Sequence, residues 1–406
     1  MNNSVQSTMR INLNESTLDQ TELDNVIALF KTNQLTMGAQ CEAFEKAFSQ
    51  LLGVKHAIMV NSGSSANLLV FFAIANPIAN QLNLLPSISP GSEIIVPALT
   101  WPTSVWPIIQ IGCVPVFVDS NPYTLQMDLD SVEAAMTSKT KAICAPHILG
   151  NAIDIPRLQY LAEKHGVWLI EDACESLGVK NHGKFAGTAG NFGTYSFYFS
   201  HHITTIEGGM VVTNHDGLAD LMRGMRAHGW VRHRHDAALY VQQNPELDSR
   251  FLFVSTGFNM RPTEINAVLG ITQLKKLVAF NEKRNFIHKT WDAAFKTIQN
   301  MGQLTCIEIT EGTDPALFGY PVLCKNKSIR TKLQIFLEKN QIETRPIICG
   351  NLTRQPALKH HFYKIHGELI GANQVMDCGL YWGMHPMMHT EQINYVIDKV
   401  LEFFNV

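Results

Sequence analysis

Several classes of protein are excluded by what the sequence lacks. Its eight cysteines occur singly, with no C-x-C or C-x-x-C spacing, so neither a disulfide framework nor a zinc site is expected. No apolar run reaches about 18 residues, the length that spans a bilayer. Residues 1–10 are polar and lack the apolar core of a signal peptide. We therefore expect a cytoplasmic protein without a membrane segment.

An excess of either charge is also absent. The chain has 32 Lys and Arg against 35 Asp and Glu, a net charge of −3, and a pI near 6.6. This balance does not favour a nucleic-acid or membrane-surface partner, so any basic site must be local. The 406 residues, 46% of them hydrophobic, can form a large core and a second, smaller domain.

Short apolar strands alternate with helices along the chain. We expect strands at 56–60, 93–96, 114–118, 142–145 and 167–171, separated by helices at 66–75, 103–111, 129–136 and 155–165. Helices at 18–30 and 40–52 precede this unit, and a helix at 262–279 closes it. The alternation predicts an α/β fold with a mainly parallel sheet and helices on both faces. We divide the chain into a flexible N-terminus (1–17), a large domain (18–284) and a smaller C-terminal α/β domain (285–406).

Two places in this pattern suit a ligand. The first strand leads through Asn61-Ser62-Gly63-Ser64-Ser65 into a helix, and unpaired backbone N–H groups at a helix N-terminus bind phosphate. The strand at 167–171 delivers Asp172 to the carboxyl edge of the sheet, where open parallel sheets place their ligands. Gly63, Ser64 and Asp172 are therefore candidates for binding, although Asp172 could instead cap a helix.

Residues 196–209 read S-F-Y-F-S-H-H-I-T-T-I-E-G-G. This segment resembles the cofactor segment S-F-x-x-x-K-x-x-x-x-x-E-G-G of the sugar aminotransferases and dehydratases of the DegT/DnrJ/EryC type, which use pyridoxal 5′-phosphate (PLP). The resemblance extends to S-G-T-A at 62–65, to E-D-A-x-Q at 171–175 and to G-Y-N-x-R-x-x-E at 257–264. These matches fall in the family's order over essentially the whole chain. The resemblance implies an aspartate-aminotransferase-like fold (PLP fold type I).

The same resemblance implies roles in cofactor binding. Asp172 would pair with the pyridine nitrogen and keep the ring an electron sink, Trp101 would stack on the ring, and Ser196 would bind the phosphate. Asn259 would reach the phosphate of a neighbouring subunit, which implies a homodimer with shared active sites. Glu175 stands where aminotransferases have glutamine, and its added charge would alter the contacts around the ring or its 3′-oxygen. A tryptophan after a strand is otherwise more often part of the core than a cofactor platform.

The lysine of the family motif is replaced here by His201, which lies five residues after Ser196 and six before Glu207. That count makes His202 a structural residue. The family's lysine binds PLP covalently and also moves a proton, whereas an imidazole can do only the second. Family variants with histidine at this position are nucleotide-sugar 3-dehydratases. His201, with an ordinary pKa of about 6.5, would act as both base and acid.

This subgroup implies a specific reaction, a carbon–oxygen lyase step. Pyridoxamine 5′-phosphate (PMP) would react with a nucleotide-linked 4-keto-6-deoxyhexose, and the C3 hydroxyl group would leave. The products would be a 4-keto-3,6-dideoxy sugar and ammonia, and L-glutamate would restore PMP. The implied substrate is GDP-4-keto-6-deoxy-D-mannose, and the implied role is dideoxysugar biosynthesis for lipopolysaccharide O-antigen.

Candidates for binding the nucleotide sugar are basic. Residues 226–230 and 350–356 resemble the dehydratase subgroup, and they contain His228 and Arg354. Arg232 begins the run Arg-His-Arg-His at 232–235, and Arg345 lies in the small domain. Guanidinium groups pair well with phosphate oxygens. A solvated loop and an ordinary histidine are the alternatives, and none of these residues identifies the base of the nucleotide.

Other functions remain open at this point. His201 could mark an inactive enzyme or an engineered replacement of lysine. A sugar 4-aminotransferase would need another lysine, and Lys180 and Lys184 lie nearby but upstream of the required position. A CDP-sugar 3-dehydratase adds an iron–sulfur cluster, which the absence of cysteine between Cys174 and Cys306 disfavours. A non-catalytic PLP- or sugar-binding protein is the last alternative.

Overall fold

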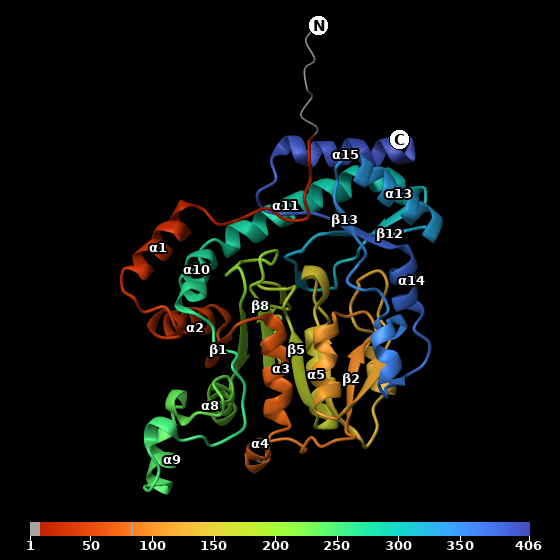
Figure 1. The fold of residues 1–406 in the computed structure, drawn as a ribbon. Coiled ribbons are helices and arrows are strands. Elements are labelled where there is room, and N and C mark those ends of the chain that lie inside the picture. Colours follow the sequence, from red (N-terminus) through yellow and green to blue (C-terminus); the bar gives the residue numbers. More distant parts are fainter. Residues whose placement is uncertain (1–8, 83) are drawn as a thin grey trace.

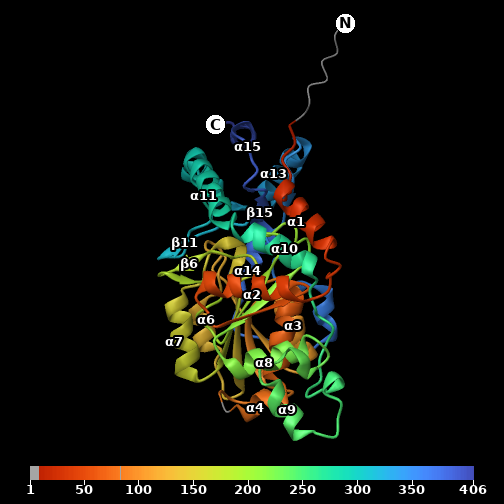
Figure 2. The same ribbon diagram turned by 90° about the vertical axis from the view of Figure 1, so that its left-hand side faces the viewer.

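The computed structural model describes residues 9–82 and 84–406. An eight-stranded sheet forms its centre (Figures 1 and 2). In spatial order its strands are β1 (His56–Val60), β9 (Gly209–Thr213), β8 (Phe192–Ser196), β5 (Trp168–Asp172), β4 (Thr140–Pro146), β2 (Glu93–Pro97), β3 (Val114–Val118) and β14 (Lys364–Ile365). The two pairings made by β9 are antiparallel and the other five are parallel. The predicted mainly parallel sheet is confirmed.

Helices cover both faces of this sheet, because alternate strand residues point to opposite sides. Ile94 and Val96 belong to one core layer, with residues of α3 (Gly63–Ile74), α5 (Trp106–Gln110) and α8 (Asp216–Met225). Ile95 belongs to the opposite layer, with residues of α6 (Leu129–Ala134) and α7 (Ile155–His165). Both faces of the strands are therefore buried, as their continuous apolar sequences predict.

Local signals fix most helix ends, and two helices differ from the prediction. The helix expected at 66–75 begins at Gly63, because the Ser62 hydroxyl caps it by accepting the N–H of Ser65 at 3.0 Å. The helix expected at 103–111 is instead a 3₁₀ turn, Pro102–Ser104, followed by α5. A proline within the first turn of α5 starts a new helix there, since it has no N–H to continue the preceding one.

The N-terminal segment and the end of the large domain pack together. Helices α1 (Gln20–Phe30) and α2 (Ala39–Leu52) contact α10 (Glu264–Leu274). The predicted helix at 262–279 is two helices, and the second, α11 (Leu277–Ala294), runs through the proposed domain boundary at residue 284. Residues 1–8 of the expected flexible N-terminus lie outside the described residues. Residues 9–17 are packed: Ile11 is buried, and its N–H donates to the carbonyl of Gln341 at 2.9 Å.

The C-terminal part builds a second, antiparallel sheet. Its spatial order is β10 (Leu304–Cys306), β12 (Tyr320–Cys324), β15 (Gly379–Trp382) and β13 (Thr344–Arg345). Helices α13 (Lys327–Lys339) and α14 (Ile370–Cys378) pack against this sheet, and α15 (Thr390–Phe404) packs against α11 and α13 (Figure 1). A small ribbon of β11 (Thr313–Asp314), β6 (Lys180–Asn181) and β7 (Lys184–Phe185) joins this part to the large one.

The remaining helices are short: α4 (Pro77–Gln81), α9 (Ala237–Gln243) and α12 (Lys296–Asn300). The segment with α9 interrupts the α/β alternation, and it projects from the body of the molecule (Figure 1). In the part of the chain that the structure describes, no helix has the length and apolar character needed to cross a membrane.

Candidate active site

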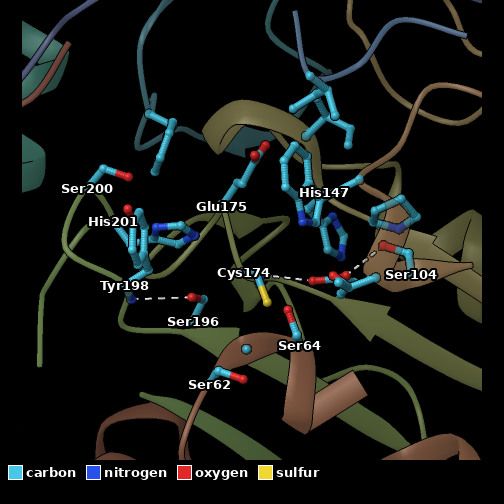
Figure 3. A pocket seen from close by; sticks show the side chains of 18 of the residues that line it. Ser62, Ser64, Ser104, His147, Cys174, Glu175, Ser196, Tyr198, Ser200 and His201 are labelled. Atoms are coloured by element: carbon cyan, nitrogen blue, oxygen red, sulfur yellow. Dashed lines mark hydrogen bonds between the residues drawn. The ribbon is translucent and has the colours of Figure 1, made fainter. Parts of the chain in front are cut away.

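A cavity of about 410 Å³ opens at the carboxyl ends of the parallel strands. Residues from β4, β5 and β8, from the start of α3 and from the C-terminal part line it (Figure 3). Seven of the predicted site residues lie together in its wall: Gly63, Ser64, Trp101, Asp172, Glu175, Ser196 and His201. Asn259, His228, Arg232, Arg345 and Arg354 do not line it.

One end of the cavity is a cradle of small side chains at the start of α3. Gly63 is the first residue of this helix, and Ser64 and Ser196 lie beside it (Figure 3). A Cβ atom on Gly63 would lie 2.6 Å from the Cβ of Ser196 and 3.1 Å from the Sγ of Cys174. Glycine therefore keeps open a space that faces the free N–H groups and positive end of the helix, which is suited to a phosphate.

The carboxylate of Asp172 is held by three donors. Its Oδ2 accepts from the Nδ2 of Asn67 at 2.7 Å and from the hydroxyl of Ser104 at 2.8 Å, and its Oδ1 accepts from the N–H of Cys174 at 3.2 Å. Sequence reasoning missed Asn67 and Ser104. Asn67 had a signal, because it lies four residues after Gly63 and so on the same face of α3. The side-chain donors turn Asp172 towards the cavity rather than leaving it as a helix cap.

His201 lines the cavity without a hydrogen bond to hold its ring. Its Nδ1 is buried and has no partner among the described residues, so Nε2 is the nitrogen that can exchange a proton with a molecule in the cavity. Burial, reinforced by the charge of Arg284, lowers the pKa of His201 to about 4. This pKa lies below the ordinary value near 6.5, so the ring is neutral at neutral pH.

Arg284 itself was not anticipated. It lies on α11, is fully buried, and its Nε and Nη1 have no partner among the described residues. Burial lowers its pKa to about 10, which still leaves it charged at neutral pH. Burial also lowers the pKa of His202, and the charge of Arg284 adds to this effect because it disfavours a second positive charge nearby.

Two other histidines near the cavity are engaged elsewhere. His147 lines the wall, but its Nδ1 accepts the N–H of Ile153 at 3.2 Å and its Nε2 therefore donates to Glu171 at 3.1 Å. His202 donates from Nε2 to the carbonyl of Ala316 at 2.6 Å. His201 is thus the histidine in this wall with a nitrogen available for proton transfer.

Glu175 is a second titratable group in the wall. Its Oε2 accepts the N–H of Leu149 at 3.0 Å. Burial, followed by the negative charge of Asp172, raises the pKa of Glu175 to about 7 against the effect of that hydrogen bond. The raised pKa reduces the negative charge that Glu175 adds to the cavity wall at neutral pH.

Trp101 stands at the mouth of the cavity with 55% of its surface exposed, so it is not a core residue. The lysines considered as alternatives point elsewhere. The Nζ of Lys184 donates to Gln159 at 2.7 Å, and that of Lys180 lies 4.5 Å from the ring centre of Phe185. Among the described residues that line the cavity, none is a lysine.

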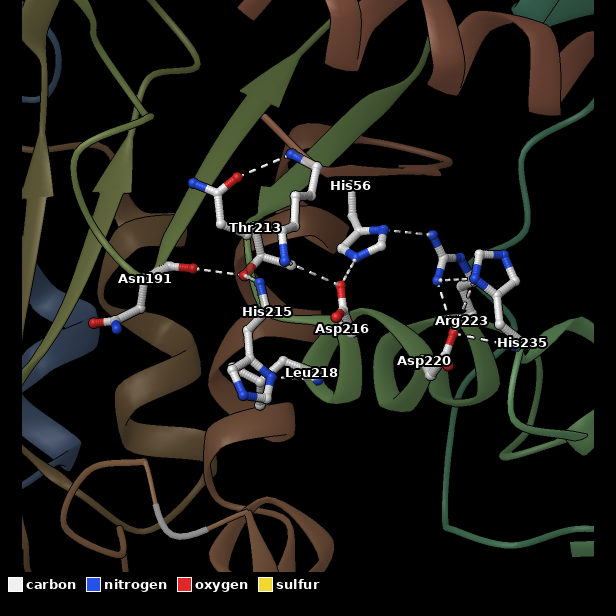
Figure 4. A network of polar contacts seen from close by, with 11 residues as sticks. His56, Asn191, Thr213, His215, Asp216, Leu218, Asp220, Arg223 and His235 are labelled. Carbon is white, nitrogen blue, oxygen red and sulfur yellow. Dashed lines mark hydrogen bonds and ion pairs between the residues drawn. The ribbon is translucent and has the colours of Figure 1, made fainter. Parts of the chain in front are cut away.

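Arg232 lines a different cavity, of about 620 Å³. Its guanidinium lies 5.2 Å from the ring centre of Trp230, and it is exposed. The neighbouring basic residues are tied into the fold: Arg234 is buried and pairs with Asp236 at 2.6 Å. Figure 4 shows the adjoining network, in which Arg223 contacts Asp220, His235 and His56 at 2.7, 3.4 and 3.3 Å. The basic run is therefore not a uniformly solvated loop.

The other substrate candidates are also exposed and lie outside the main cavity. His228 has a left-handed backbone (φ 65°) that turns its side chain to solvent. Arg345 pairs with Glu343 at 2.7 Å, and Arg354 lies 3.7 Å from Asp377. Asn259 is exposed and accepts from the Nε of Arg261 at 3.1 Å. One chain alone does not bring these residues to His201.

The residues that line the main cavity fit PLP. The cradle at Gly63 supplies backbone and hydroxyl donors for a phosphate, the buried Asp172 carboxylate suits a pyridinium nitrogen, and the exposed indole of Trp101 offers a face for a ring. The group that would bind PLP covalently is missing from the wall, since imidazole replaces the amine.

Sequence comparisons match the chain to known proteins along most of its length. The model of the DegT/DnrJ/EryC1/StrS aminotransferase family matches residues 16–401. The chain is 37% identical to the GDP-4-keto-6-deoxy-D-mannose 3-dehydratase of Yersinia pseudotuberculosis, over 95% of this chain and 97% of the relative. It is 29% identical to the GDP-perosamine synthase of Vibrio cholerae, over 91% and 92%.

A solved structure extends the agreement to the fold. A GDP-4-keto-6-deoxymannose-3-dehydratase with a trapped PLP-glutamate geminal diamine superposes with a TM-score of 0.87 at 32% identity, over 96% of this chain and 99% of that one. The predicted aminotransferase-type fold is therefore confirmed.

Proposed function

Because the chain belongs to the DegT/DnrJ/EryC1/StrS aminotransferase family, we propose that it is a PLP/PMP-dependent nucleotide-sugar 3-dehydratase. It removes the C3 hydroxyl group from a nucleotide-linked 4-keto-6-deoxyhexose, with GDP-4-keto-6-deoxy-D-mannose as the substrate to test first. One observation carries this proposal: the position of the family's lysine is taken by His201, in a cavity whose described lining contains no lysine. The similarity to a 3-dehydratase along the whole chain supports it.

The cofactor would be held without a covalent bond. Ser64, Ser196 and the start of α3 would bind its phosphate, Asp172 its pyridine nitrogen, and Trp101 its ring. When bound, the cofactor supplies an amine that reacts with a ketone and a ring that accepts electrons. L-glutamate is the proposed amino donor, and a relative that contains PLP and glutamate supports that choice.

His201 would move the proton in this reaction. Burial keeps its ring neutral at neutral pH. In the tautomer that carries its hydrogen on Nδ1, Nε2 has the free lone pair and can act as a base. Once protonated, the imidazole of His201 is a strong acid, because its burial and the positive charge of Arg284 both disfavour the protonated form. That property suits the second step, in which the ring returns the proton to the departing hydroxide. A single residue then serves as base and acid.

We propose that residues of a second subunit complete the site. Asn259, His228 and Arg232 are exposed and lie outside the cavity of their own chain, so we propose that they complete the cavity of a second copy in a homodimer. Mixing His201→Asn chains with Asn259→Ala chains tests this directly. Hybrid dimers should regain activity because one of their two sites is intact, and an inactive mixture in which hybrids have formed would contradict shared sites.

The reaction is tested by following the nitrogen of L-glutamate and the C3 oxygen of the sugar in one experiment. The protein, PLP, ¹⁵N-labelled L-glutamate and GDP-4-keto-6-deoxy-D-mannose are incubated, the sugar is analysed by mass spectrometry, and ammonium is assayed. A nitrogen-free deoxygenated keto sugar with labelled ammonium is the expected result. An aminated sugar that retains its C3 oxygen would establish a 4-aminotransferase instead. His201→Asn is the control, and it should bind PLP without turnover.

The aminotransferase is the second candidate, because a GDP-perosamine synthase is also similar over most of the chain. It would need another group in place of the lysine amine, and Lys180 and Lys184 are held outside the cavity. Binding of cofactor with no change in any nucleotide sugar would favour a non-catalytic PLP-binding protein.

A further inference from the structure

The ring of His201 is positioned by aromatic packing. Its centre lies 5.1 Å from that of Phe318, with the planes at 75°, and 5.9 Å from that of Tyr198, with the planes at 86°. The buried Nδ1 has no partner among the described residues. By contrast, His147 and His202 are each fixed by hydrogen bonds. Among the described residues, the orientation of the His201 ring therefore depends on its contacts with Phe318 and Tyr198.

Phe318 comes from the C-terminal part of the chain, and its backbone is tied to the large domain. Its N–H donates to the carbonyl of Leu149 at 3.0 Å, and the N–H of Ala316 donates to the carbonyl of Gly150 at 2.9 Å. His202 donates to the carbonyl of Ala316 at 2.6 Å. Three hydrogen bonds thus hold the segment that carries Phe318.

The turn that receives this segment has little freedom. Leu149 has a left-handed backbone (φ 50°), which is unusual for a residue with a Cβ. Gly150 is also left-handed (φ 81°), and a Cβ there would lie 2.0 Å from the carbonyl oxygen of Ala316. The N–H of Leu149 is bound by Glu175 at 3.0 Å. The same turn therefore links a carboxyl in the cavity wall to the segment that places Phe318.

We infer that Phe318 is a positioning residue for His201. Its ring orients the imidazole, a role that a hydrogen bond to Nδ1 plays in many other histidines. This inference rests on the proposed function for its catalytic consequence. Proton transfer requires the nitrogen to lie within hydrogen-bond reach of the reacting atom, and an imidazole released from one of its two ring contacts rotates away from that position. The Leu149-Gly150 turn supports this role by fixing the backbone of Phe318.

The test compares Phe318→Ala with Phe318→Tyr, which keeps the ring. Phe362→Ala is the matched control, because Phe362 is 71% exposed and lies outside the cavity. We expect Phe318→Ala to lower kcat about tenfold while the Kd for PLP changes less than twofold. Phe318→Tyr should retain most of the rate, and Phe362→Ala should equal the wild type. If Phe318→Ala does not fold, Phe318→Leu, which keeps the apolar volume without the ring, takes its place.

A second measurement separates positioning from simple packing. The histidines are labelled with ¹⁵N, and His201 is assigned in the cofactor-free protein by comparison with His201→Asn. Its titration midpoint should rise from about 4 towards 6.5 in Phe318→Ala, because water then reaches the ring. A folded Phe318→Ala variant with an unchanged titration midpoint for His201 would overturn the inference. Because this measurement uses no substrate, it decides the role of Phe318 even if the wild type shows no dehydratase turnover.

Discussion

Replacing Glu175 by glutamine should make the stability of the cofactor-free protein less dependent on pH. Burial raises the pKa of Glu175 from 4.5 to about 7, so the folded state binds a proton that the unfolded state releases between these values. The stability that this proton gives is fully present below pH 4.5 and is lost as the pH rises through 7. A glutamine removes the loss, and its amide oxygen can still accept the N–H of Leu149.

The size of the effect follows from the same values. The pKa shift of Glu175 from 4.5 to about 7, at about 1.4 kcal/mol per pKa unit, corresponds to about 3 kcal/mol in the free energy of unfolding. This is an upper value, because the carboxyl is partly open to the cavity. For a chain of this size it corresponds to a rise of roughly 3–4 °C in Tm.

Thermal unfolding of the two proteins from pH 4 to pH 8.5 is the assay. The difference in Tm between Glu175→Gln and the wild type should be small at pH 4, grow between pH 5 and 7, and stay constant above pH 8. Titrating histidines affect both proteins alike and cancel in the difference. Glu246→Gln, at an exposed position outside the cavity, controls for the loss of one carboxylate. A difference that does not vary with pH would refute the reasoning.

Three further predictions concern residues of the proposed cofactor site. Gly63→Ala should weaken PLP binding at least tenfold in an absorbance titration, because the new Cβ would lie 2.6 Å from that of Ser196 and the phosphate cradle would have to widen. The control Gly217→Ala, in the first turn of α8, should bind PLP normally. Equal affinity of the two variants for PLP would show that Gly63 does not form part of the cradle. Asp172→Asn should destabilise the cofactor-free protein by about 1–3 kcal/mol, because its amide NH2 must face either the N–H of Cys174 or the side-chain donors of Asn67 and Ser104. An unchanged Tm would contradict those hydrogen bonds. His201→Lys should bind PLP covalently, because burial keeps part of the new amine neutral. Intact-protein mass spectrometry after borohydride reduction would show the added mass of the cofactor. Absence of this mass would argue against matching His201 to the family's lysine.

Local signals in the sequence predicted much of the fold. The strands β1 and β3 and the helix α7 have the predicted bounds. Helix α7 is delimited by Asp154, which caps its start, and by the left-handed Gly166 at its end. Boundaries were wrong where a cap or a proline sets a helix start that the apolar pattern does not show. Helix α3 begins earlier than predicted, at Gly63, and α5 begins later, at Trp106. The pattern locates the buried face of an element more accurately than its first residue.

The sequence by itself determined the composition of the candidate site: a helix start after β1, a carboxylate at the end of β5, and His201 at the family's lysine position. These are properties of short segments whose order along a parallel sheet brings their ends together. Only the tertiary structure decided how His201 is held and charged. Phe318 and Arg284 reach it from the C-terminal part and from α11, and its pKa depends on burial that no local pattern encodes. Burial and long-range contacts belong to the folded chain as a whole, so they appear only when the fold is known.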